Sequence, residues 1–181
     1  ASVSFVCGLM VINSRKKEYV MIELSKLNHT KKLTISALVL ALYVVIMWLT
    51  QSFAFGAYQI RIATALYALA YLFPFLVLPL GLANMVSNLV MGGMGLPDIL
   101  GGFAVGILTA LCCYLIRRKG WNPLLVAIPV ILIPGLGVAT WLSAILNIGY
   151  WAMALSLLIG QLLPGVVGAI LVKALKGRVV K

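Results

Sequence analysis

The chain has 181 residues, of which 64% are hydrophobic and 9% are charged. A typical soluble domain has about 45–50% apolar and about 25% charged residues, so this composition excludes a soluble globular enzyme. The 14 lysine and arginine residues outnumber the 3 aspartate and glutamate residues, which gives a net charge of +11. In a membrane protein such an excess reports orientation rather than nucleic-acid binding.

The N-terminal segment precedes the first apolar span. Residues 1–12 form a weak apolar run that is followed by Arg15, Lys16 and Lys17, whereas a signal peptide carries its charges before its apolar run. Met21 begins a more ordinary start. We therefore interpret residues 1–30 as a leader and cytoplasmic segment, in which residues 1–20 are either upstream of the native start or a disordered leader.

Apolar runs long enough for membrane helices follow. A spanning helix needs about 20 apolar residues to cross a core about 30 Å thick, and the clear runs cover 33–48, 97–116, 124–145 and 150–172. The stretch 58–91 is too long for one helix and short for two, and two prolines interrupt it.

The positive-inside rule decides how to divide the stretch 58–91. Two short helices place the basic residues at 31–32, 117–119 and 173–181 on one side of the membrane. The sequence therefore predicts an all-α membrane protein with six transmembrane helices in residues 31–175. Both termini are then cytoplasmic, including the tail 176–181.

Few polar residues fall inside the spans or at their outer ends, where an ionisable residue is a candidate for a functional site. One cation, one anion and several amides there suit a polar, ring-shaped small molecule, because amides both donate and accept hydrogen bonds. Structural explanations are an ion pair, helix-dipole stabilisation, interhelical amide bonds and an aromatic belt. The predicted substrate-binding residues are Gln59, Arg61, Asn84, Asn88, Asp98, Trp141, Asn147 and Tyr150.

Several chemistries are disfavoured by what the sequence lacks. His29 is the single histidine, and the three cysteines have no metal-ligand spacing, so we expect no metal site, no bound cofactor and no enzymatic activity. A phosphate-binding Gly-x-x-x-x-Gly-Lys-Ser/Thr motif is missing. The chain therefore cannot couple ATP hydrolysis by itself.

Four sequence stretches together carry a family resemblance. They are Ala37-x-x-x-Ala41, Phe-Gly-Ala-Tyr-Gln-Ile-Arg at 55–61, Ala-Asn to Asn-Leu at 83–89, and Gly-Leu-Pro-Asp-Ile-Leu-Gly at 95–101. Over residues 31–175 the chain resembles the S-components of energy-coupling factor (ECF) transporters, and among them the queuosine precursor transporter family, QueT. One departure is Ala63-Thr64, where that family often has a glutamate.

The resemblance implies a multi-pass subunit of the bacterial plasma membrane that binds a micronutrient near its outer face. It implies docking through helix 1, including Ala37 and Ala41, onto a transmembrane coupling subunit. Two cytoplasmic ATPases would use the ATP. The implied substrate is a 7-deazaguanine precursor of queuosine, and Gln59, Arg61, Asn88 and Asp98 match the family pattern. The alternatives are an S-component for another vitamin such as cobalamin, or a stand-alone secondary transporter.

Overall fold

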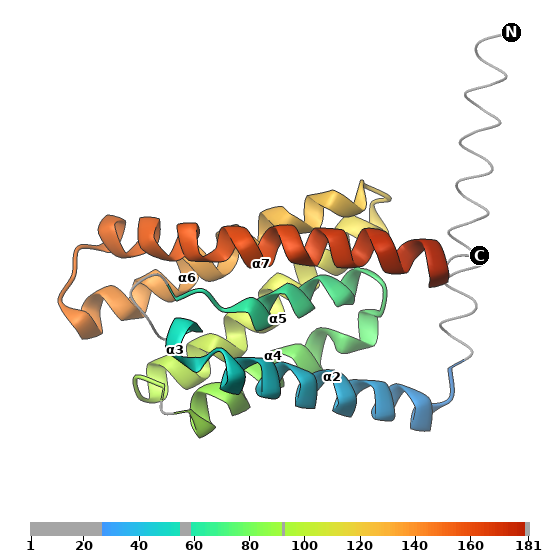
Figure 1. Cartoon of the computed structure of the whole chain (residues 1–181), viewed down its shortest axis with the longest axis horizontal. Coiled ribbons are helices and arrows are strands. Elements are labelled where there is room, and N and C mark those ends of the chain that lie inside the picture. The colour runs from blue at the N-terminus through green and yellow to red at the C-terminus, as the bar shows by residue number, and fades with distance from the viewer. Residues whose placement is uncertain (1–26, 55–58, 92, 180–181) are drawn as a thin grey trace, which may run out of the picture.

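The computed structural model describes residues 27–54, 59–91 and 93–179, and in these ranges every regular element is a helix (Figure 1). The all-α fold class is confirmed, while the expected leader of residues 1–20 lies outside the described residues. In chain order the elements are α2 (His29–Leu49), α3 (Gln51–Ala54), η1 (Ile62–Tyr71), η2 (Pro74–Leu76), α4 (Val77–Val90), α5 (Leu96–Arg118), η3 (Pro123–Val126), α6 (Ala127–Leu146) and α7 (Tyr150–Val179).

Within the described ranges, four helices are long and apolar enough to cross a membrane: His29–Leu49, Leu96–Arg118, Pro123–Leu146 and Tyr150–Lys176. The stretch that the sequence left ambiguous divides into two shorter apolar helices, Ile62–Tyr71 and Pro74–Val90. Pro74 stands at the start of the second of these, where its missing N–H costs no helical hydrogen bond. The six-span count and the cytoplasmic placement of both termini stay predictions.

The short helix η1 is the central element of the bundle and runs between α7 and α2 (Figure 1). Nine of its ten residues are buried, and it is a 3₁₀ helix, whose rise of about 2.0 Å per residue gives a length of about 20 Å. Its neighbours approach closely because they present glycines. A Cβ on Gly168 of α7 would lie 2.9 Å from the carbonyl oxygen of Ala65, and one on Gly106 of α5 would lie 3.3 Å from Tyr67 Oη.

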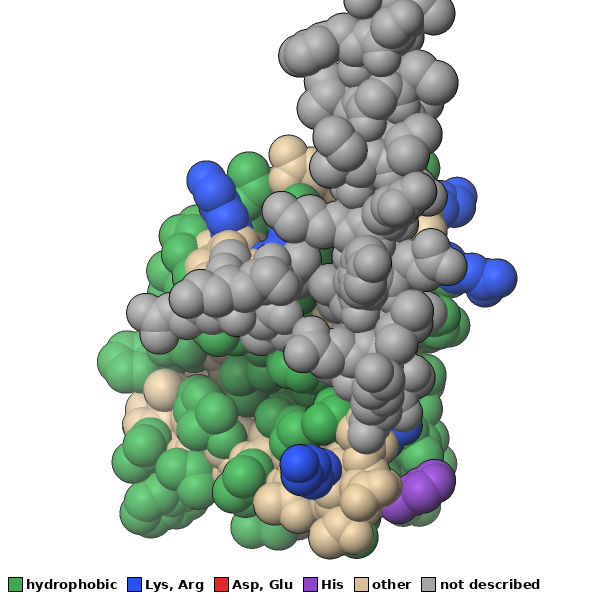
Figure 2. Space-filling view, turned by 90° about the vertical axis from the view of Figure 1, so that its right-hand side faces the viewer, with side chains coloured by type: hydrophobic (Ala, Val, Ile, Leu, Met, Phe, Trp, Pro, Cys, Tyr) green, Lys and Arg blue, Asp and Glu red, His purple; other side chains and the backbone are tan. Residues whose placement is uncertain are grey.

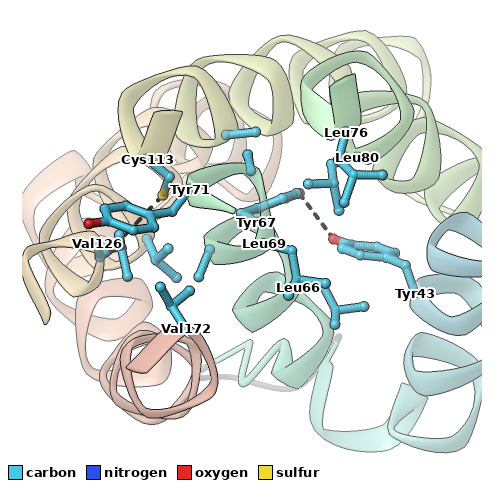
Figure 3. Packing of buried hydrophobic residues seen from close by; sticks show 14 of the residues in the cluster. Tyr43, Leu66, Tyr67, Leu69, Tyr71, Leu76, Leu80, Cys113, Val126 and Val172 are labelled. Atoms are coloured by element: carbon cyan, nitrogen blue, oxygen red, sulfur yellow. Dashed lines mark hydrogen bonds between the residues drawn. The ribbon is translucent and has the colours of Figure 1, made fainter. Parts of the chain in front are cut away.

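The main hydrophobic core surrounds η1. Figure 3 shows Tyr67 and Leu66 of η1 between Tyr43 of α2 and Val172 of α7. The hydroxyl oxygens of Tyr43 and Tyr67 are 3.1 Å apart, and both rings are fully buried. A second cluster joins α5, α6 and α7. The core therefore fixes the position of η1 against every long helix that it contacts.

The two ends of the bundle differ in charge. The N-terminal end of α2 and the C-terminal ends of α5 and α7 lie together, and Figure 2 shows lysine and arginine side chains around this end. Arg117 donates to the carbonyl of Tyr71 at 3.1 Å and also to that of Leu72, so its guanidinium caps the end of η1. The described residues that form this basic end are Lys31, Lys32, Arg117, Arg118, Lys119, Lys173 and Lys176.

Candidate functional site

Two buried ions face each other at the end of the bundle opposite the basic end. Arg61 lies directly before η1 and is 3% exposed, and Asp98 lies in the first turn of α5 and is 2% exposed. Arg61 Nη2 is 4.0 Å from Asp98 Oδ2. Among the described residues Asp98 is the only carboxylate side chain. Removing an ion from water is costly unless it is paired and hydrogen-bonded, so the pair requires further polar partners.

The turn before α5 places the Asp98 carboxylate. Gly95 has a φ of 88°, which is the left-handed region where glycine carries no steric penalty. Pro97 occupies the start of the helix, where its fixed φ suits the first turn. The backbone N–H of Met94 then donates to Asp98 Oδ2 at 3.3 Å. Local turn chemistry thus directs the carboxylate back toward the bundle interior.

Asn84 and Asn88 connect Arg61 to the backbone of α5 from one face of α4. Arg61 Nη1 donates to Asn84 Oδ1 at 3.4 Å and to Asn88 Oδ1 at 3.2 Å. The same amides donate from Nδ2 to the backbone of α5, Asn84 to the carbonyl of Gly102 at 2.8 Å and Asn88 to that of Asp98 at 2.9 Å. Each amide oxygen therefore accepts from the Arg61 guanidinium, and each amide N–H group donates to a backbone carbonyl of α5.

Glycines make room for this polar cluster. A Cβ on Gly102 would lie 2.7 Å from Asn88 Nδ2 and 3.2 Å from Asn84 Nδ2, and one on Gly93 would lie 2.8 Å from Asp98 Oδ2. Any side chain at either position must displace a member of the cluster. Gly102 is not among the residues predicted from the sequence, so its place against the asparagines was missed.

Trp141 joins the cluster from α6. Its indole Nε1 donates to Asp98 Oδ1 at 3.1 Å. The six-membered part of the ring packs on Gly101, where a Cβ would lie 2.7–2.9 Å from Cη2, Cζ2 and Cζ3. The cluster of Arg61, Asn84, Asn88, Asp98 and Trp141, called the polar cluster below, therefore combines side chains from four segments that are distant in the sequence.

Two residues that were not predicted from the sequence, Thr64 and Gln161, form a hydrogen-bonded chain to the backbone carbonyl of Arg61. Thr64 Oγ1 is 2.7 Å from the carbonyl oxygen of Arg61 and 2.8 Å from Oε1 of Gln161, and both side chains are buried. A hydroxyl has one proton, so an amide orientation in which Gln161 donates to Thr64 satisfies both contacts. A glutamine within the apolar run of α7 was the available sequence signal for this residue.

A second path of buried polar groups leads from the polar cluster to α2. Tyr67 Oη is 3.1 Å from the hydroxyl of Tyr43, and Asn84 lies close to the same phenol group. Asn84 therefore contacts Arg61, the backbone of α5 and the η1 tyrosine. This arrangement connects the polar cluster with the helix whose outer face carries Ala37 and Ala41, both of which are exposed.

The remaining predicted site residues lie at the same end but in other surroundings. Gln59 is buried just before Arg61 and has a φ of 41°. Asn147 is exposed and ends α6 in the left-handed conformation, a backbone role that asparagine fills readily. Tyr150 donates its hydroxyl to the carbonyl of Leu136 at 3.3 Å, which ties the start of α7 to α6. Asn147 and Tyr150 therefore stabilise the junction between α6 and α7.

The polar cluster has the donor and acceptor inventory of a small-molecule site. It offers a guanidinium, a carboxylate, two amides and an indole N–H within one buried region. Among the described residues no group of three His, Cys, Asp or Glu side chains gathers that could hold a metal ion. The chemistry available is therefore charge-assisted hydrogen bonding to a planar polar group.

The fold and the polar cluster define a multi-pass helical membrane protein with a buried polar site near one end of its bundle. Comparison with protein-family models matches residues 33–177 to a family described as QueT transporter. The chain belongs to the QueT transporter family, which confirms the resemblance seen in the sequence and makes this a membrane transport protein. Comparisons with curated proteins and with solved structures found no match.

Proposed function

We propose that this chain is the substrate-binding S-component of an ECF-type importer and that it takes up a 7-deazaguanine precursor of queuosine. Membership of the QueT transporter family supports the proposal. The observation that carries it is the buried Asp98 carboxylate, which lies 4.0 Å from Arg61, whose guanidinium donates to two asparagines. A buried ion pair in a membrane domain is expensive and marks a functional site by default.

The chemistry of the polar cluster fits the edge of a deazaguanine. That edge presents a ring N–H and an amino group as donors, and a carbonyl as an acceptor. Asp98 accepts from the donor pair, and Arg61 donates to the carbonyl. Each charge-assisted bond contributes about 1.5–3 kcal/mol net, so a few such bonds give a specific site.

The outer face of α2 is the proposed docking surface for a coupling subunit. Ala37 and Ala41 are exposed one helical turn apart, and small residues allow another helix to approach closely. Two cytoplasmic ATPases complete the importer and use the ATP, since this sequence has no phosphate-binding loop of its own. The basic end of the bundle then faces the cytoplasm of a bacterial cell, in accordance with the positive-inside rule.

A binding panel tests the substrate assignment. Calorimetry on the detergent-purified chain compares queuine, 7-aminomethyl-7-deazaguanine, 7-cyano-7-deazaguanine and cobalamin. We expect a deazaguanine to bind and Asp98→Asn to weaken its binding more than tenfold, because the charge that strengthens the bond is lost. Ser52→Ala is the control, since this side chain is exposed on α3 and is not among the predicted site residues. Cobalamin binding alone, or equal affinity in Asp98→Asn, would contradict the proposal.

A second experiment tests the partners. We expect Ala37→Trp with Ala41→Trp to abolish transport and co-purification of the ATPases while deazaguanine binding persists. Leu155→Trp provides the control, because Leu155 is exposed on α7, away from α2. Transport by the chain without any ATPase partner would show a stand-alone transporter instead.

A further inference from the structure

One polar side chain interrupts the apolar run of α7. Between Ser156 and Lys173 every other residue of this helix is apolar or a glycine, yet the Gln161 side chain is 3% exposed and so lies inside the bundle. A polar residue within a membrane span is costly and indicates a function by default. Gln161 is not a member of the polar cluster, so its burial needs an explanation of its own.

Gln161 contacts the first turn of η1 through Thr64. The terminal amide of Gln161 lies 2.8 Å from Thr64 Oγ1, and Thr64 Oγ1 lies 2.7 Å from the carbonyl oxygen of Arg61. The backbone N–H of Thr64 donates to the same carbonyl at 3.0 Å. The Arg61 carbonyl is therefore held by two groups of one residue, and α7 holds the side chain of that residue.

The close approach of α7 to η1 brings the two side chains together. Gly168 follows Gln161 by about two helical turns and therefore lies on the same face of α7. A Cβ on Gly168 would lie 2.9 Å from the carbonyl oxygen of Ala65, so a glycine is required for α7 to pack this closely on the backbone of η1. The contact between Gln161 and Thr64 is thus set by the packing of one helix backbone on another.

The backbone that leads into η1 is irregular at the cation of the site. Gln59 has a φ of 41°, in the left-handed region that residues other than glycine seldom adopt. Arg61 has a φ of −90° and a ψ of 83°, outside the helical region. Such conformations persist where surrounding contacts hold them. From this backbone the guanidinium donates to Asn84 and Asn88, so the bonds to the Arg61 carbonyl help to set where the guanidinium lies.

We infer that Gln161 and Thr64 are positioning residues for the ligand-binding cation. Gln161 orients the Thr64 hydroxyl, and this hydroxyl holds the Arg61 backbone so that the guanidinium lies in the polar cluster. The inference rests on the proposed function and extends it, because the polar cluster itself takes no residue from α7. The affinity for the ligand then depends on α7 without any contact between α7 and the ligand.

Apolar replacements of similar shape separate positioning from stability. Thr64→Val strands the buried amide of Gln161, whereas Thr64→Val with Gln161→Leu strands no amide and should recover most of the lost stability. Both variants lack the hydroxyl on the Arg61 carbonyl. We therefore expect both to bind 7-aminomethyl-7-deazaguanine about fivefold more weakly than the native chain in calorimetry. Native affinity in the double variant would show a structural role only and would overturn the inference.

Two further variants control this test. Thr64→Ser keeps the hydroxyl, so its affinity should stay within about twofold of the native value. Thr109→Val is the matched control, because Thr109 is fully buried on α5 and its hydroxyl donates to the carbonyl of Val105 in its own helix at 2.7 Å. We expect no change in its affinity. An equal loss in Thr109→Val would show a general effect of removing a buried hydroxyl and would contradict the inference.

A second measurement is made without ligand. Labelling arginine with nitrogen-15 gives a nuclear magnetic resonance signal for each side-chain Nε–H, and the signal that is lost in Arg61→Lys belongs to Arg61. We expect this signal to shift in Thr64→Val with Gln161→Leu and to stay in place in Thr109→Val, because only the first change releases the Arg61 backbone. An unchanged Arg61 signal would overturn the inference.

Failure of the proposed function is distinguishable from failure of the inference. If the native chain binds none of the deazaguanines in the panel, the proposed function fails, and the Arg61 signal alone then decides whether Thr64 positions the guanidinium. If the native chain binds 7-aminomethyl-7-deazaguanine and the double variant binds it equally well, only the positioning role is refuted.

Discussion

The energetic coupling between Arg61 and Asp98 is the quantity on which the site argument depends, and a double-mutant cycle measures it. The single variants are Arg61→Met and Asp98→Asn, and the third is their combination. The closest charged atoms are 4.0 Å apart, and both side chains are almost fully buried. At this distance and an effective dielectric constant of about 20, two unit charges attract by about 4 kcal/mol.

Removing one partner costs more than it would at a surface because the other ion stays buried. Loss of one member of a buried pair typically destabilises by about 3–5 kcal/mol. Here Asn84 and Asn88 continue to accept from Arg61 in Asp98→Asn, so we expect the lower end of that range. Removing both ions eliminates the stranded charge, and the double variant should therefore lose less than the sum of the singles by about 2–4 kcal/mol.

Unfolding by sodium dodecyl sulfate titration in mixed micelles reports these free energies. The buried thiol of Cys113 provides the probe in a variant that lacks the other two cysteines, since a thiol-reactive fluorophore reaches it only after unfolding. Strictly additive losses in the double variant, or single losses under about 1 kcal/mol, would refute the coupling. The polar cluster would then be a set of independent contacts.

The same titration tests three further contacts. Gly102→Ala should destabilise by about 1–3 kcal/mol because its Cβ would lie 2.7 Å from an asparagine amide, whereas Gly149→Ala, with open space around it, should stay within about 0.5 kcal/mol of the native chain. Arg117→Gln removes donors from two carbonyls at the end of η1 and should cost about 1.5–3 kcal/mol, while the exposed Arg118→Gln should have little effect. Tyr67→Phe should cost about 1 kcal/mol, because its hydroxyl is hydrogen-bonded to the buried hydroxyl of Tyr43; no loss would show that Tyr43 rearranges at no cost.

The parts of the site that the sequence predicted follow from simple periodicity and from the scarcity of charge. Asn84 and Asn88 are four residues apart and therefore share a helix face, and the structure places both on Arg61. Arg61 and Asp98 stood out as the ions away from the basic end. In an apolar chain each such residue is costly, so its presence alone indicates a role.

The rest of the site depends on how closely the helices approach one another in the folded protein. Patterns in a single sequence do not contain that information. Gln161 was visible as a polar residue in an apolar run, but its contact with Thr64 requires that α7 packs on the first turn of η1. The distance between Trp141 and Asp98 depends on how closely α6 approaches α5 at Gly101. Asn147 illustrates the opposite case, since its left-handed conformation at the end of α6 is a local effect.

The internal pairing of the polar cluster has a consequence for how a carrier of this kind releases its ligand. Arg61 is paired with Asp98 and donates to both asparagines, so each of the two ions has an internal partner. Where a bond to a ligand takes the place of one of these internal bonds, its contribution to the affinity is the difference between the two. Such a difference is smaller than the sum of the bonds, and an importer benefits from this because it must let go of what it binds. A site whose charged side chains had no internal partners would bind its ligand more tightly, but it would be less stable without the ligand.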